Sequence, residues 1–102
     1  QVNGSSMEPT IRNGGYCVFR FERGGSRNEK VVLVQGRQVD DPENGGQYTV
    51  KRYFSEKLYF DDGTWRHKKI TLVPDNHEFK EIILENVDPA KFRVIAEFVA
   101  CL

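Results

Sequence analysis

Apolar and polar residues alternate in short stretches along most of this 102-residue chain, and turn-forming residues follow nearly every stretch. Alternation with a period of two places every second side chain on one face of a β-strand. We expect seven strands, over residues 16–21, 30–35, 47–54, 58–60, 65–73, 79–84 and 92–101. Helical turns are expected only at residues 6–12 and 88–91. This pattern predicts a mainly β fold with mostly antiparallel connections, as a partly open barrel or a sandwich of short strands.

Glycine-containing clusters mark the expected breaks between strands. Residues 24–26 and the polar stretch 40–46 are rich in turn formers, and Asp62-Gly63 is a strong signal for a tight hairpin. The stretch 30–35 is continuously apolar in its middle, which is typical of a strand buried on both sides. The length fits a single domain over residues 1–102.

Composition and charge exclude several function classes. Fifteen Lys and Arg residues balance fifteen Asp and Glu residues, so we expect no direct nucleic-acid binding by this segment. No apolar run approaches the roughly 20 residues of a membrane helix, and no signal peptide is visible. We therefore expect a cytoplasmic protein without membrane contact. Cys17 and Cys101 lie in apolar alternating stretches, where buried reduced thiols are expected.

Residues 4–11 contain the first candidate for chemistry, a Gly-Ser-Ser-Met-Glu-Pro-Thr-Ile segment that precedes the first expected strand. A serine in such a turn can be presented beside converging backbone N–H groups, as an oxyanion hole requires. On local sequence alone, Ser6 could equally cap the short turn that follows it.

The expected strand around Lys51 contains the second candidate. Thr49 and Lys51 share one face of this strand, and Arg52 lies on the other. If both faces are covered, one of the two basic residues must point inward. Burial disfavours the charged form of an amine, so a buried lysine becomes a usable general base. Thr49 could then orient the amine by a hydrogen bond. The alternative is that Lys51 is a solvated residue on an open face.

Taken together, the strings Ser6-Met7-Glu8-Pro9-Thr10 and Thr49-Val50-Lys51-Arg52 resemble the Ser–Lys core of the LexA-type self-cleaving peptidases. That family includes LexA, phage-type repressors and UmuD, with type I signal peptidases as more distant relatives. Residues 72–82 resemble the family's Leu…Asn-Pro…Tyr-x-Pro-Ile stretch, and residues 92–99 resemble its closing Val-Ile-Gly-Val-Val strand. The resemblance covers essentially the whole chain and implies a LexA/signal-peptidase-like antiparallel β domain.

The resemblance also implies a role for each matching residue. Ser6 would be the nucleophile and Lys51 the general base. The backbone N–H groups of Ser5 and Ser6 would stabilise the oxyanion, with Thr49 as a supporting residue. No cofactor is expected. No metal is expected either, since His67 and His77 lack metal-ligand spacing.

Some positions depart from the family pattern. Gly14-Gly15 stands where Gly-Asp is usual, His77 replaces a proline, and Ala96-Glu97 replaces Gly-Val. The separation of 45 positions between Ser6 and Lys51 exceeds the commoner family spacing, and we expect loop 40–46 to accommodate the surplus. The basic run 65–69 beside a tryptophan is interpreted as a solvated hairpin edge.

The expected substrate is a segment of the same polypeptide. Family members are cut at Ala-Gly or Cys-Gly upstream of the serine, but only five residues precede Ser6 and none forms such a pair. Gln1 in place of Met indicates an excised or processed fragment. The cleaved segment would therefore lie before residue 1 and bind as an extended strand. The resemblance further implies an N-terminal DNA-binding or other effector domain, RecA-filament stimulation and a role in the SOS response and transcription regulation.

A homodimer is expected through residues 92–101. This stretch carries apolar residues on both faces, so its second face needs cover, and LexA-like proteins dimerise through the corresponding region. Two other functions remain open. One is a non-catalytic dimerisation or binding module of the same fold, and the other is a type I signal-peptidase-like processing enzyme.

Overall fold

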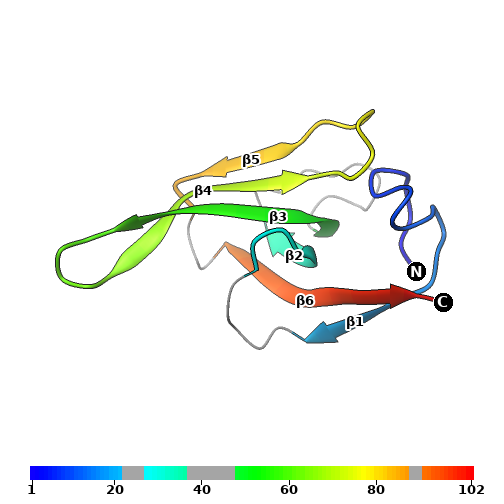
Figure 1. The fold of residues 1–102 in the computed structure, drawn as a ribbon, viewed down its shortest axis with the longest axis horizontal. Helices are drawn as coiled ribbons and strands as arrows, with labels where there is room; N and C mark the ends of the chain where they lie inside the picture. Colours follow the sequence, from blue (N-terminus) through cyan, green and yellow to red (C-terminus); the bar gives the residue numbers. More distant parts are fainter. Residues whose placement is uncertain (22–26, 37–47, 88–90) are drawn as a thin grey trace.

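The computed structural model describes residues 1–21, 27–36, 48–87 and 91–102. Its strands are β1 (Cys17–Phe21), β2 (Val31–Gly36), β3 (Tyr48–Tyr59), β4 (Trp65–Val73), β5 (Ile82–Glu85) and β6 (Phe92–Cys101) (Figure 1). They form a single sheet in the order β1-β6-β2-β3-β4-β5, and every neighbouring pair is antiparallel. Among the described residues there is no helix, and hence none that could span a membrane.

The mainly β prediction is confirmed, with one open sheet in place of a sandwich. The separate strands expected at 47–54 and 58–60 are one continuous strand, β3, because the polar residues between them stay extended and pair with β4. The pairing with β4 shifts register between Glu56 and Lys57, where β4 has one extra residue, Lys68. The strand expected at 79–84 begins only at Ile82. The breaks expected at 24–26 and 40–46, and most of the turn at 88–91, lie outside the described residues.

The Asp62-Gly63 hairpin signal is confirmed between β3 and β4. The amide of Phe60 donates to the carbonyl of Thr64 at 2.9 Å, and the Asp62 carboxylate accepts the Thr64 amide at 2.9 Å. Gly63 adopts φ = +86°, a conformation that a residue with a Cβ rarely adopts. Glycine at this position therefore allows the tight return of the chain.

Apolar clusters lie on both sides of the sheet. Val31 and Val32 are neighbours in β2, so their side chains point to opposite faces, and each belongs to a different cluster. The buried members on one side are Val32, Val34, Tyr53, Ile70, Leu72 and Leu84. Those on the other side are Met7, Ile11, Val31 and Val50. As expected, β2 is buried on both faces, and the N-terminal segment covers one of them.

The expectation of two buried, reduced thiols is wrong, because Cys17 and Cys101 form a disulfide. Cys17 is half-buried and Cys101 is exposed. The reason lies in the sheet register. β1 pairs antiparallel with the end of β6, which places the two cysteines directly opposite each other although 84 positions separate them in the chain. Sequence alternation alone shows neither this pairing nor its register.

Loss of the disulfide should destabilise the domain measurably. A bond that closes so long a loop restricts the unfolded chain strongly, so we expect Cys17→Ser to lower the free energy of unfolding by about 2–5 kcal/mol. Urea denaturation of the oxidised wild type and the variant would measure this. Reducing agent should destabilise the wild type by a similar amount and leave Cys17→Ser unchanged. Equal stability of oxidised and reduced wild type would contradict the prediction.

Candidate active site

The turn that carries Ser6 is anchored by apolar and backbone contacts. Met7 and Ile11 are 2% and 1% exposed, and the amide of Ile11 donates to the Met7 carbonyl at 2.9 Å, which closes one helical turn. Just before it, Val2 pairs with Gly15 through a backbone hydrogen bond of 2.9 Å. Figure 1 shows this N-terminal segment beside the end of β4. The apolar residues on each side of the turn therefore hold Ser6 in a fixed place.

Lys51 lies on β3 with its side chain turned inward, as one of the two sequence interpretations expected. It is 3% exposed, and its Nζ donates to Ser6 Oγ at 3.0 Å and to Thr49 Oγ1 at 2.6 Å. Ser6 and Thr49 are themselves buried. The solvated-face alternative for Lys51 is therefore wrong, and three sequence-predicted site residues meet in one buried cluster.

The observed hydrogen bonds differ from those of a capping serine. A serine cap at residue 6 would accept the amide of residue 8 or 9. Pro9 has no amide hydrogen, and the Glu8 amide donates instead to the Ser5 carbonyl at 3.2 Å. The Ser6 hydroxyl contacts the Lys51 amine. This distance lies in the range in which a general base can take a proton from a hydroxyl.

Asn76, which sequence analysis did not single out, holds the two peptide groups around Ser6. Its backbone amide donates to the Ser6 carbonyl at 2.9 Å, and its side-chain Nδ2 donates to the Ser5 carbonyl at 3.0 Å. A trans peptide group is planar with its C=O and N–H opposed. The N–H groups of Ser6 and Met7 therefore point away from Asn76. The available signal was the match of residues 72–82 to the family's Asn-containing stretch.

The contact with Asn76 bears on one of the two expected oxyanion donors, the Ser6 N–H. The direction of the Ser6 N–H follows from the Asn76 contact to the Ser5 carbonyl. The N–H of Ser5 belongs to the preceding peptide group, between Gly4 and Ser5. Gly4, which begins that group, adopts φ = +100°, so the turn before Ser5 has a backbone conformation suited to glycine.

An ion pair fastens the segment after β4 to β3 and to the N-terminal turn. Arg52 donates to both carboxylate oxygens of Asp75 at 2.9 Å, and Thr10 Oγ1 donates to the same carboxylate at 2.5 Å. The Asp75 amide donates to the Met7 sulfur at 3.5 Å. The hydrogen bonds from Arg52 are the main cause of a lowered pKa at Asp75. Two adjacent residues of β3 thus have different partners. Lys51 contacts Ser6, and Arg52 contacts Asp75 in the segment that supports Ser6.

A cavity of about 470 Å³ adjoins the buried cluster at Thr49. Its wall comes from the N-terminal segment and from β1, β2 and β3. It has both polar and apolar parts, and the apolar part includes Val2, Phe19, Leu33 and Val50. Such a cavity can receive an apolar side chain of a bound peptide. Among the described residues, no group of three or more His, Cys, Asp or Glu side chains could hold a metal ion.

Comparison with known proteins gives one match. A family model described as Peptidase S24-like matches residues 1–99. No curated protein and no solved structure matches the chain. The matched range includes Ser6, Lys51, Thr49 and Asn76.

Asp75→Asn should lower the free energy of unfolding by about 1–2 kcal/mol at pH 7, because a charge-assisted pair with Arg52 is lost. The lowered pKa of Asp75 makes this stabilisation complete above the unfolded-state pKa of about 3.9. It is lost as pH falls towards the lower folded-state pKa. Urea denaturation between pH 7 and pH 3 would measure both effects.

The control for this variant is Asp61→Asn, an exposed carboxylate in the β3–β4 turn. A surface change of this kind should alter stability by less than about 0.5 kcal/mol. Equal effects of the two substitutions at pH 7 would show that the Arg52 pair does not fasten the segment.

Proposed function

This chain belongs to the Peptidase S24-like family, and on that premise we propose that it is a serine peptidase domain with Ser6 and Lys51 as its catalytic dyad. The observation that supports this most directly is the 3.0 Å contact between Lys51 Nζ and Ser6 Oγ within a buried cluster. A buried amine is costly to keep charged unless it is paired and hydrogen-bonded. A hydroxyl nucleophile beside a lysine base satisfies the geometric requirement for covalent catalysis.

In the proposed reaction, the neutral amine of Lys51 takes the proton of the Ser6 hydroxyl as Oγ attacks the peptide carbonyl carbon. The carbonyl oxygen becomes an oxyanion, which accepts hydrogen bonds from the N–H groups of Ser5 and Ser6. Collapse of the tetrahedral intermediate breaks the C–N bond, and the leaving amine takes the proton back from Lys51. Lys51 then takes a proton from water as the water oxygen attacks the acyl carbon. Collapse of this second intermediate breaks the ester bond to Ser6 Oγ, which takes the proton back from Lys51 as the second product leaves.

Thr49 and Asn76 act in this proposal as positioning residues. The 2.6 Å contact between Thr49 Oγ1 and Lys51 Nζ restricts the amine, so that its lone pair can be directed at Ser6 once a proton has left. Asn76 directs the Ser6 N–H by holding the Ser5 carbonyl. The two residues thus position the proton acceptor and an oxyanion donor respectively.

We propose that the substrate is a segment of the parent polypeptide upstream of residue 1, cut within the same chain. It would bind as an extended strand and place an apolar side chain in the 470 Å³ cavity beside Thr49. The proposal includes a cytoplasmic parent whose self-cleavage a RecA filament stimulates, as the family resemblance implies. In a reducing cytoplasm the disulfide would contribute to stability only in oxidised molecules.

A homodimer is also part of the proposal. The sequence argument for it was the uncovered second face of residues 92–101, whereas the structure provides a different argument. β6 is no edge strand, since β1 and β2 pair with its two sides. Apolar residues nevertheless remain exposed around β1 and β6, including Tyr16, Val18, Phe21 and Val99. Such a surface favours association with a second copy. The same surface supports the second candidate function, a non-catalytic dimerisation module of this fold.

Replacing either member of the dyad should stop self-cleavage. In the full-length parent, we expect Ser6→Ala and Lys51→Met each to lower the cleavage rate by at least about 10³-fold. Gel electrophoresis of the purified parent over time would measure this. Lys68→Met, at an exposed position on β4, is the matched control and should cleave at the wild-type rate.

Two outcomes would contradict the dyad. Cleavage that persists in Ser6→Ala would place the nucleophile elsewhere. A folded wild-type parent that dimerises but is not cut at any pH would favour the dimerisation module.

Asn76→Ala should slow self-cleavage by about 10- to 100-fold, because an oxyanion donor then loses its fixed direction. The positioning role predicts an unchanged pH dependence of the remaining activity, since the base is untouched. A matched Asn28→Ala variant, at a position that contacts Ser55 and not the dyad, should cleave normally. If Asn76→Ala lowers thermal stability but not the rate per folded molecule, Asn76 has only a structural role.

A further inference from the structure

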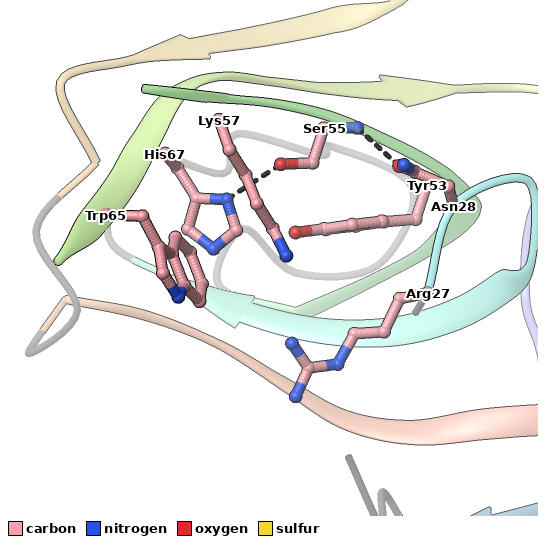
Figure 2. A pocket seen from close by; sticks show the side chains of 7 residues that line it. All are labelled: Arg27, Asn28, Tyr53, Ser55, Lys57, Trp65 and His67. Carbon is pink, nitrogen blue, oxygen red and sulfur yellow. Dashed lines mark hydrogen bonds between the residues drawn. The ribbon is translucent and has the colours of Figure 1, made fainter. Parts of the chain in front are cut away.

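A second cavity lies along the part of β3 that pairs with β4. Its volume is about 360 Å³, and Figure 2 shows its walls. The residues of the two strands that carry the argument below are Ser55, Lys57, Trp65 and His67. Ser55 lies four positions beyond Lys51, roughly 13 Å along the strand, so this cavity is separate from the proposed dyad.

A serine hydroxyl and an imidazole meet in this cavity. Ser55 Oγ lies 2.7 Å from Nδ1 of His67, and Figure 2 marks this contact. The distance is within the range in which an imidazole can take a proton from a hydroxyl. Both residues are half-buried. A nucleophile and a base in hydrogen-bond contact are the first requirement for covalent catalysis by a hydroxyl group.

The register between β3 and β4 brings His67 to this cavity. His67 pairs with Lys57, because the extra residue of β4, Lys68, precedes this pair along the ladder. With an unbroken register His67 would pair with Leu58, and its side chain would lie on the other face of the sheet. The sequence interpretation of residues 65–69 as a solvated hairpin edge is therefore incomplete, since part of this run lines a cavity.

Neighbouring groups position both partners of this contact. The Trp65 ring packs edge-on against the imidazole of His67, with the ring centres 5.1 Å apart and an angle of 82° between the planes. The Ser55 amide donates to Oδ1 of Asn28 at 2.8 Å, which holds the main chain that carries the hydroxyl. The base and the nucleophile are therefore each positioned by a third group, as a catalytic arrangement requires.

The imidazole is in its neutral form at neutral pH. Burial is the main reason that the pKa of His67 is lowered, and the charges of Lys57 and Arg27 add to the effect. Since the ordinary value is about 6.5, the unprotonated ring dominates at pH 7. Nδ1 can then accept the Ser55 hydroxyl proton, with the ring hydrogen on Nε2.

The Lys57 amine adds a positive charge beside the serine and the imidazole. It lies 4.2 Å from the centre of the Trp65 ring, and Figure 2 shows it reaching past the imidazole into the cavity. Ser55 and Lys57 are two positions apart on one face of β3, which separates their Cα atoms by roughly 7 Å. A cation so placed can stabilise negative charge on an oxygen that develops next to Ser55 Oγ.

We propose that this cavity is a second catalytic site, which hydrolyses small aryl esters of carboxylic acids with Ser55 as nucleophile and His67 as general base. Nδ1 of His67 takes the hydroxyl proton while Ser55 Oγ attacks the ester carbonyl carbon, and the carbonyl oxygen becomes an oxyanion beside Lys57. Collapse of this intermediate breaks the bond to the aryl oxygen, which takes the proton from His67. His67 then takes a proton from water as the water oxygen attacks the acyl carbon. Collapse of the second intermediate frees the carboxylic acid, and Ser55 Oγ takes the proton back.

The properties of the cavity favour aryl esters as the substrate class. An imidazole with a lowered pKa is a weak base, so the site suits esters whose leaving oxygen is itself weakly basic, as in a phenol. Trp65 is exposed in the cavity wall and can pack against an aromatic ring. A volume of about 360 Å³ is near the lower end for ligand pockets, which limits the substrate to a small molecule.

The probe is p-nitrophenyl acetate, and the protein is the Ser6→Ala form of the full-length parent, so that the proposed dyad does not contribute. We expect saturable release of p-nitrophenol, and an acetyl group on Ser55 in mass spectra of acid-quenched protein. Ser55→Ala and His67→Gln should each lower the rate at least about tenfold. His77→Gln is the matched control, because it removes the one other histidine of the chain and should change the rate less than about twofold.

The rate of ester hydrolysis should follow the titration of His67. Because only the unprotonated imidazole acts as a base, the rate above the spontaneous reaction should rise as pH increases through the lowered pKa of His67 and level off near neutral pH. The other charged and titratable groups that line the cavity are Arg27, Tyr53 and Lys57. Lys57→Gln should raise the pKa of this profile, since the Lys57 charge lowers that of His67, and should also reduce the rate at the plateau.

Several outcomes would overturn the proposal. They are a rate no higher than that of free imidazole at equal concentration, no acetyl group on Ser55, and an undiminished rate in Ser55→Ala, which would make the imidazole itself the nucleophile. Equal losses in His67→Gln and His77→Gln would indicate only the general reactivity of histidine side chains. Should His67→Gln fail to fold, the acetyl group on Ser55 and the rate in Ser55→Ala still decide the question.

Discussion

The amine of Lys51, buried in the interior between two hydroxyl groups, is the constraint on which the arrangement of this site depends. A lysine amine that is 3% exposed needs hydrogen-bond acceptors, and Ser6 and Thr49 provide them at 3.0 and 2.6 Å. Thr49 comes from the same strand and face, so its contact follows from strand geometry. Ser6 comes from a segment 45 positions away, which must be held in place by other contacts.

The supporting contacts converge on the segment that follows β4. Asn76 binds the carbonyls of Ser5 and Ser6, while Asp75 binds Arg52, the neighbour of Lys51 on β3. Because successive strand residues point to opposite faces, Lys51 can reach Ser6 while Arg52 fastens the support. The buried side chain of Met7 also fastens the N-terminal turn to the apolar cluster on the sheet. The site therefore depends on three chain segments that only the sheet brings together.

β3 connects this site with the cavity of about 360 Å³ shown in Figure 2, because residues of this single long strand contribute to both. Its first half pairs with β2 and carries Lys51, and its second half pairs with β4 and carries Lys57. Polar groups on a partly buried strand face are costly unless they are satisfied. Near Lys51 the turn with Ser6 satisfies them. Farther along β3, Ser55 contacts His67 of β4 and Asn28 of the segment before β2.

Alternation of apolar residues determined the mainly β fold, because the period of a strand is a property of neighbouring residues. The pair that meets, Ser6 and Lys51, was predicted by the resemblance of the Ser-Met-Glu-Pro-Thr and Thr-Val-Lys-Arg strings to a known family. The contacts of Asn76 and the Cys17–Cys101 disulfide could not be predicted from the residues alone. Each depends on which strands pair and in which register, and a shift of one residue would turn every side chain to the other face. The tertiary structure therefore decided the contacts that support the site, because these contacts depend on long-range pairing in the sheet. The local sequence determined the groups that are supported, Ser6 and Lys51.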